Sequence, residues 1–94
     1  MGKTNTVVVK NKAGIHARPS ATIVKTANQF SSDIVISKGD TEANARDIMS
    51  VLTLGASCGT ELTVTAEGED AEEALNTICD LLGKEFNFDN ANEV

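Results

Sequence analysis

The stretch TELTVTAEG, residues 60–68, decides the fold class because apolar and polar side chains alternate along it. Successive side chains of an extended strand point to opposite faces of its sheet. One face of this strand therefore carries Leu62, Val64 and Ala66, and the other carries Glu61, Thr63 and Thr65. This pattern predicts a sheet with one face covered by other elements and one face in water.

The segment after this strand is predicted to form a helix over residues 70–84. Its apolar stripe consists of Ala71, Leu75, Ile78 and Leu82, which recur at helical spacing. The first turn carries the negative charges of Asp70, Glu72 and Glu73, which suit the positive end of a helix. Cys79 falls on the apolar face, where a small buried side chain is its expected role.

The residues before the strand predict a hairpin and a short helix. SDIVIS (32–37) and TEANA (41–45) are strand-like segments joined by the turn KGD (38–40). In RDIMSVLTLG (46–55), Asp47 suits a helix N-cap and Gly55 suits a helix stop. The side chains expected to face inward are Ile48, Val51 and Leu54. Met49 and Leu52 then lie on another side, which gives the helix more apolar surface than one core needs and indicates a partner surface.

The N-terminal part completes the fold. TVVVK (6–10) is rich in β-branched residues and is predicted to be a buried strand, and NKAG after it is typical of a turn. A helix is expected over residues 17–29, with an apolar stripe formed by Ile23, Val24, Ala27 and Phe30. The order βαββαβα predicts a single α+β domain, in which helices cover one face of an antiparallel sheet.

Composition limits the function classes. The formal net charge is −6 and no run of basic residues occurs, so we do not expect a nucleic-acid partner. No apolar stretch approaches the roughly 18 residues that span a bilayer, and the N-terminus lacks the features of a signal peptide, so a cytoplasmic location is expected. Cys58 and Cys79 are expected to be reduced thiols. One histidine without a CxxC pair predicts no metal site.

His16 is the candidate functional residue, because it stands where the first helix begins and is a poor N-cap. A helix start presents free N–H groups and partial positive charge, Arg18 adds a guanidinium that matches phosphate oxygens, and Pro19 suits the first turn. Gly14 can adopt the backbone angles of a tight join. A neutral imidazole in this place can act as a nucleophile toward phosphorus. The residues alone leave two alternatives: a surface histidine beside an arginine by chance, and an acid–base residue of an enzyme, for which no second catalytic group is evident.

GIHARP, residues 14–19, resembles the active-site signature of the HPr family, the histidine-containing phosphocarriers of the bacterial phosphotransferase system. The resemblance extends over residues 4–83. It implies an open-faced β-sandwich of four antiparallel strands and three helices. It also implies that His16 is phosphorylated on Nδ1 by phospho-enzyme I, with the group derived from phosphoenolpyruvate, and passes it to an enzyme IIA in sugar uptake. Arg18 and the amide of Ala17 would stabilise the phosphoryl group, and the protein would be a carrier without cofactor or turnover of its own.

The resemblance further implies a docking surface on the first two helices. The matching positions are Ala21, Thr22, Lys25, Met49, Leu52 and Thr53. The alternative for Met49 and Leu52 is an ordinary core position. The expected partners are enzyme I, enzyme IIA proteins and transcriptional regulators, and the expected state is a monomer.

Asp47 departs from the family pattern, because many relatives carry a regulatory phosphorylated serine there. The aspartate is expected to serve as an N-cap, with weak mimicry of the modified serine as the alternative. Residues 1–84 are expected to form the domain and the acidic segment 85–94 a frayed tail. Two rival functions remain: a paralogue in a regulatory or nitrogen-related phosphotransfer chain, and a regulatory binding module without phosphotransfer, whose cue would be a replaced histidine.

Overall fold

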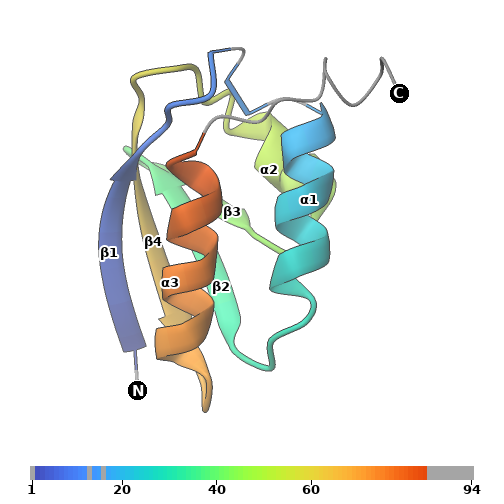
Figure 1. The fold of residues 1–94 in the computed structure, drawn as a ribbon, viewed down its shortest axis with the longest axis vertical. Coiled ribbons are helices and arrows are strands. Elements are labelled where there is room, and N and C mark those ends of the chain that lie inside the picture. The colour runs from blue at the N-terminus through green and yellow to red at the C-terminus, as the bar shows by residue number, and fades with distance from the viewer. Residues whose placement is uncertain (1, 13, 16, 85–94) are drawn as a thin grey trace.

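A four-stranded antiparallel sheet with three helices on one of its faces makes up the fold (Figure 1). In this computed structural model, residues 2–12, 14–15 and 17–84 are described, with the backbone alone for Ala17 and Arg18. The elements are β1 (Gly2–Val8), α1 (Ala17–Ala27), β2 (Asp33–Lys38), β3 (Thr41–Asn44), α2 (Ile48–Thr53), β4 (Glu61–Glu67) and α3 (Ala71–Leu82). The predicted order and the open-faced β-sandwich are confirmed.

The spatial order of the strands is β1-β4-β2-β3, so β4 is an interior strand and β1 and β3 are the edges. Each neighbouring pair is antiparallel. The alternation of β4 holds: Leu62, Val64 and Ala66 are fully buried under the helices. No helix within residues 2–12, 14–15 and 17–84 is long and apolar enough to cross a bilayer.

The core forms between the covered face of the sheet and the helices. The apolar stripe predicted for α3 is confirmed, since Ala71, Leu75, Ile78 and Leu82 are all buried. The sheet supplies Ile34, Ile36 and Ala43 in addition to the β4 residues, and α1 and α2 supply Ile23, Ala27 and Val51. These side chains form one continuous cluster, as expected for a single small domain.

The prediction of a buried N-terminal strand is wrong. β1 begins at Gly2, ends at Val8 and exposes most of its side chains. Its register with β4 places Thr6 and Val8 on the face that the helices leave uncovered, and as an edge strand it pairs with β4 alone. Val7 packs against the core, and Val9, just beyond the strand, is buried. The β-branched run indicated a strand correctly, but local composition does not reveal which strand of a sheet lies at the edge.

The inward side predicted for the short helix α2 is confirmed except at its first residue. Val51 and Leu54 are buried as expected, but Ile48 is 37% exposed. Ile48 is the first residue of α2 and so lies at the end of the helix. The α1 helix ends at Ala27, two residues before the predicted end.

A polar junction fixes the loop between α1 and β2. The Asp70 carboxylate accepts hydrogen bonds from the backbone N–H of Ser31 (3.0 Å) and Ser32 (2.9 Å) and from the Ser32 hydroxyl. The hydrogen bond from the Ser32 hydroxyl and then the one from the Ser31 amide lower the pKa of Asp70. Arg46 Nη2 donates to the carbonyls of Phe30 (2.6 Å) and Ser32 (2.9 Å). Asp70 therefore holds a loop rather than capping α3 with its side chain.

Candidate functional site

The segment that leads to α1 is fixed against the loop between α2 and β4. The N–H of Val9 donates to the carbonyl of Thr60 (2.9 Å), and the N–H of Gly59 donates back to Val9 (2.8 Å). The N–H of Ile15 donates to the carbonyl of Ala56 (2.8 Å). Residues far apart in the sequence thus hold both ends of the segment 9–15, and Ile15, the residue before His16, is buried.

Asn11 and Gly14 close this segment into a turn. The N–H of Gly14 donates to the Asn11 carbonyl (2.9 Å), and the buried Asn11 side chain donates from Nδ2 to the Gly14 carbonyl (2.7 Å). Gly14 has φ +77°, and a Cβ there would lie 2.6 Å from the carbonyl oxygen of Ala56. Both observations require glycine, which confirms the role predicted for it at this join.

The α1 helix begins at Ala17, the residue that follows His16 in the sequence. Pro19 and Ser20 in its first turn are buried and fix the helix start against the core. The first turn contains no acidic residue, whereas that of α3 contains Glu72 and Glu73. The N–H groups at the start of α1 therefore have no carboxylate in the same turn, which favours an anion brought from outside.

His16 itself lies outside the described residues, as do the side chains of Ala17 and Arg18. The backbone of the last two is part of α1. The assignments of phosphoryl acceptor to His16 and of phosphoryl stabilisation to Arg18 and the Ala17 amide stay predictions.

The six docking positions lie on α1 and α2, two helices that pack against each other. The exposed positions are Ala21, Lys25, Met49 and Thr53, and the partly buried ones are Thr22 and Leu52. Met49 is 66% exposed, which excludes the core alternative for it. With Ile48, it gives the N-terminal part of α2 two exposed apolar side chains, as a partner surface requires.

Asp47 is the N-cap of α2, as predicted. Its Oδ1 accepts the N–H of Met49 (3.1 Å) and its Oδ2 accepts the hydroxyl of Ser50 (3.1 Å). At the other end of α2, Gly55 has φ +60° and donates its N–H to the Leu52 carbonyl (3.1 Å), so the predicted helix stop is also confirmed.

Sequence patterns missed Asn11 and the loop 56–60 as supports of the site. The turn-like NKAG stretch was the available signal for Asn11, whose partner is Gly14. Nothing in the sequence indicated that Ala56, Gly59 and Thr60 form hydrogen bonds with Val9 and Ile15 at the two ends of the segment. Both cysteines are free: Cys58 is exposed, and Cys79 is partly buried. Burial, with a smaller effect of the Asp80 charge, raises the pKa of the Cys79 thiol.

The described residues contain no cluster of three or more metal-ligating side chains.

Comparisons with known proteins agree with this fold. The family model described as the PTS HPr component phosphorylation site matches residues 3–84. The phosphocarrier protein HPr of Treponema pallidum is 43% identical over 81 residues, which cover 86% of this chain and 92% of that protein. The crystal structure of an HPr from Bacillus anthracis superposes with a TM-score of 0.83 at 40% identity, covering 86% of this chain and 96% of that one.

A second similar structure is that of Crh, a catabolite repression protein of Bacillus subtilis that is described as a dimer with a swapped domain. Its TM-score is 0.70 at 42% identity, with 81% of this chain and 87% of that chain covered. The family match spans nearly the whole described chain, from β1 to the end of α3. This chain therefore belongs to the HPr family of phosphocarrier proteins of the phosphotransferase system.

Proposed function

We propose that this protein accepts a phosphoryl group on His16 from phospho-enzyme I, which obtains it from phosphoenolpyruvate, and passes it to an enzyme IIA during sugar uptake. The observation that carries the proposal is the backbone on either side of His16 in the sequence. The N–H of Ile15 donates a hydrogen bond to the Ala56 carbonyl, and α1 begins at Ala17 with no acidic residue in its first turn. An anion is favoured at such a helix start.

The proposed reaction is transfer between nucleophiles. A ring nitrogen of neutral His16 supplies an electron pair to phosphorus, a P–N bond forms, and the bond between phosphorus and its donor breaks with its electron pair staying on the donor. The N–H groups of the first turn of α1 and the guanidinium of Arg18 would stabilise the negative phosphoryl oxygens. The second transfer reverses these roles, so the protein ends unchanged and acts as a stoichiometric carrier without a cofactor.

The α1–α2 surface is the proposed docking site for enzyme I and enzyme IIA, with transcriptional regulators as further partners. Met49 supplies the large exposed apolar side chain, and Lys25 supplies an exposed positive charge on the adjoining helix. Apolar anchors surrounded by polar groups are the usual composition of a transient protein interface. The position of this surface beside the start of α1 would bring a partner's phosphoryl centre toward His16.

We further propose that residues 1–84 form one domain, that the acidic segment 85–94 lies outside it, and that the protein works in the cytoplasm as a monomer. The family match, which ends at residue 84, supports this boundary. Size-exclusion chromatography would distinguish a monomer from a dimer like the one described for Crh.

The test of the proposed function is phosphorylation of the purified protein with phosphoenolpyruvate and enzyme I. We expect one phosphate per chain that is labile in acid and stable in base. His16→Ala should abolish the labelling, and Ser50→Ala should leave it unchanged, which excludes a phosphoserine on α2. Normal labelling of His16→Ala would refute the assignment.

A second candidate is a regulatory role without phosphotransfer, favoured by the similarity to Crh, a protein connected with catabolite repression. The intact His16 favours the carrier, because a purely regulatory module does not need a nucleophile. Lack of labelling by enzyme I, together with binding to a transcriptional regulator, would favour the second role.

A further inference from the structure

The face of the sheet that the helices leave uncovered carries uncharged side chains along its middle. Strand alternation and register place on it Thr4, Thr6 and the exposed Val8 of β1, Thr63 and Thr65 of β4, and Val35 and Ser37 of β2. The Thr4 and Thr65 hydroxyl oxygens are 3.3 Å apart across the β1–β4 pair. All three helices lie on the other side, so no element of the described chain covers this face (Figure 1).

The charged strand residues on this open face are all acidic. They are Asp33, Glu42, Glu61 and Glu67. The two strand lysines lie on the helix side: Lys3 is paired with the buried Ala66, and the Lys38 ammonium lies near Gly55, 3.9 Å from where a Cβ would stand. Among the described residues, none of the four carboxylates forms an ion pair with a lysine or an arginine.

Two of these carboxylates stand directly opposite each other. Asp33 of β2 is the register partner of Glu67 of β4, and like charges at directly opposed positions destabilise a sheet. Uncharged polar residues in place of these carboxylates would keep the exposed face hydrated without this repulsion. The stability of the fold therefore does not account for the charge pattern, whereas a positively charged partner would.

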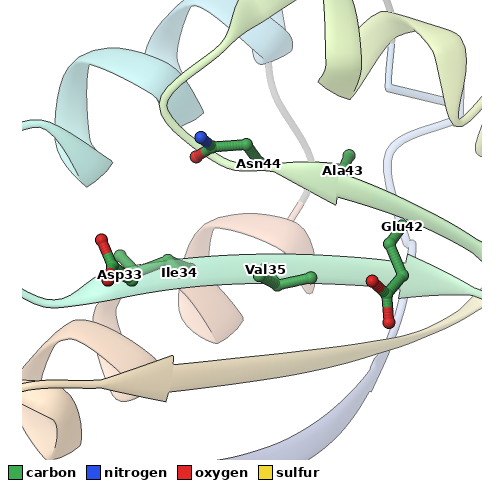
Figure 2. A pocket seen from close by; sticks show the side chains of 6 residues that line it. All are labelled: Asp33, Ile34, Val35, Glu42, Ala43 and Asn44. Carbon is green, nitrogen blue, oxygen red and sulfur yellow. The ribbon is translucent and has the colours of Figure 1, made fainter.

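The open face also has a depression over the paired strands β2 and β3. The depression has a volume of about 400 Å³ and is lined by Asp33, Ile34, Val35, Glu42, Ala43 and Asn44. Figure 2 shows Val35 between the carboxylates of Asp33 and Glu42, which lie toward opposite ends of the depression. An apolar surface between two carboxylates matches a long cationic side chain, whose methylene stem packs on Val35 while its charged end reaches an oxygen.

We propose that the open face of the sheet is a second docking surface, which binds a positively charged surface of a partner protein and takes one of its arginine or lysine side chains over Val35, between Asp33 and Glu42. Charge complementarity selects this occupant. A second copy of the same face would bring eight carboxylates together, so self-association through this face is disfavoured. The proposal goes beyond phosphotransfer, since none of these residues belongs to the site around His16.

The size of the face makes the complex weak and transient. Strands of 7, 6, 4 and 7 residues, about 4.8 Å apart with a rise of about 3.3 Å per residue, give an area on the order of 400 Å². A stable interface buries about 800 Å² on each partner. Association through this face should therefore depend on its charges and weaken steeply with added salt.

The test uses the full chain labelled with ¹⁵N and an acetylated, amidated tetra-arginine peptide at low ionic strength. We expect the amide shifts of Val35, Thr63 and Thr65 to move with the peptide, and the movement to vanish in high salt. Asp33→Asn combined with Glu42→Gln should weaken binding roughly three- to tenfold. The matched control is Glu72→Gln with Glu73→Gln, two exposed residues of α3 that remove the same charge on the helix side, and it should leave the affinity within about twofold.

The proposal is overturned if the peptide shifts α3 or the C-terminal segment and not the open face, or if the two double variants weaken binding equally. Glu67→Gln gives an independent readout, because removing the repulsion with Asp33 should raise the melting temperature by a few degrees. An unchanged or lower melting temperature would contradict the argument from opposed charges. Phosphorylation of Asp33→Asn/Glu42→Gln by enzyme I should proceed at the normal rate, so failure of this proposal is distinguishable from failure of the carrier function.

Discussion

Gly14 is the residue on which the position of the loop before α1 depends. Its φ of +77° suits glycine alone, and a Cβ would stand 2.6 Å from the Ala56 carbonyl oxygen. We expect Gly14→Ala to lower the free energy of unfolding by about 1–3 kcal/mol from backbone strain, with the steric conflict added to it. Urea denaturation measures this change.

Gly39→Ala is the matched control for this substitution. Gly39 has φ +59°, but no atom lies within 4 Å of where its Cβ would stand. Gly39→Ala should therefore lower the free energy of unfolding by about 1–2 kcal/mol, from backbone strain alone. It should leave the rate of His16 phosphorylation unchanged. If Gly14→Ala and Gly39→Ala lower the free energy of unfolding equally, the close approach of Gly14 to the Ala56 carbonyl adds no steric cost, which contradicts this argument.

Asp70 gives the fold a dependence on pH. Because hydrogen bonds from Ser32 and Ser31 lower its pKa in the folded protein, the stabilisation is complete above the unfolded value near 3.8 and is lost as the pH falls through the lower folded value. Asp70→Asn should thus melt at a lower temperature than the unchanged protein at neutral pH, and this difference should shrink in acid. Asp40→Asn, at an exposed position, is the control. A difference that persists at every pH would show that the charge of Asp70 is not what stabilises the loop.

At the scale of single residues, the sequence predicted the local roles. Asp47 as N-cap and Gly55 as helix stop follow from hydrogen bonds and backbone angles within a few positions of the residue itself. The role of Asp70 was missed because its carboxylate accepts a hydrogen bond from Ser32, 38 residues earlier in the chain, and only folding brings the two together. The role of Asn11 was missed although its partner Gly14 is near in the sequence, because the turn-like stretch does not show which side chain closes the turn.

The α2 element combines a buried side and an exposed apolar side in six residues. Met49 is 66% exposed, whereas Val51 is fully buried. We expect Met49→Ala to weaken enzyme I binding by more than about 1 kcal/mol while changing stability by less than about 0.5 kcal/mol. Calorimetric titration with enzyme I and thermal melting measure the two effects.

Val51→Ala should show the opposite ranking. Its removal from the core should cost about 2 kcal/mol of stability, with little change in enzyme I affinity at a temperature where the variant is folded. A Met49→Ala variant that loses stability and keeps its affinity would place the docking surface elsewhere.

Sequence patterns predicted burial correctly for β4 and α3 but not for β1. The alternation in β4 and the stripe in α3 predicted their burial correctly, because each pattern spans several periods of a single covered face. β1 was predicted as buried because three valines in a row resemble an interior strand. Only the pairing of β1 with β4 alone identifies it as an edge, and pairing is a property of the whole sheet.

At the scale of the molecule, two faces of one sheet have separate chemistry. The helix side carries the core, the start of α1 and the exposed apolar residues of α2, and the open side carries four carboxylates and a shallow depression. The sequence predicted both faces and the βαββαβα order, because β4 alternates clearly and each of the two long helices has one apolar stripe. The contact between residues 9–15 and 56–60, which holds the loop before α1, could not be predicted, since it joins two irregular segments.

The central claim is that the protein carries a phosphoryl group between two partners through His16. The most direct measurement isolates the phosphorylated protein free of enzyme I and phosphoenolpyruvate, mixes it with an enzyme IIA, and follows the phosphoryl group by intact mass on both proteins. We expect the mass of one phosphoryl group to leave this chain and appear on enzyme IIA in equal amount. Retention of the group on this chain, or its release as inorganic phosphate without labelled enzyme IIA, would contradict the account.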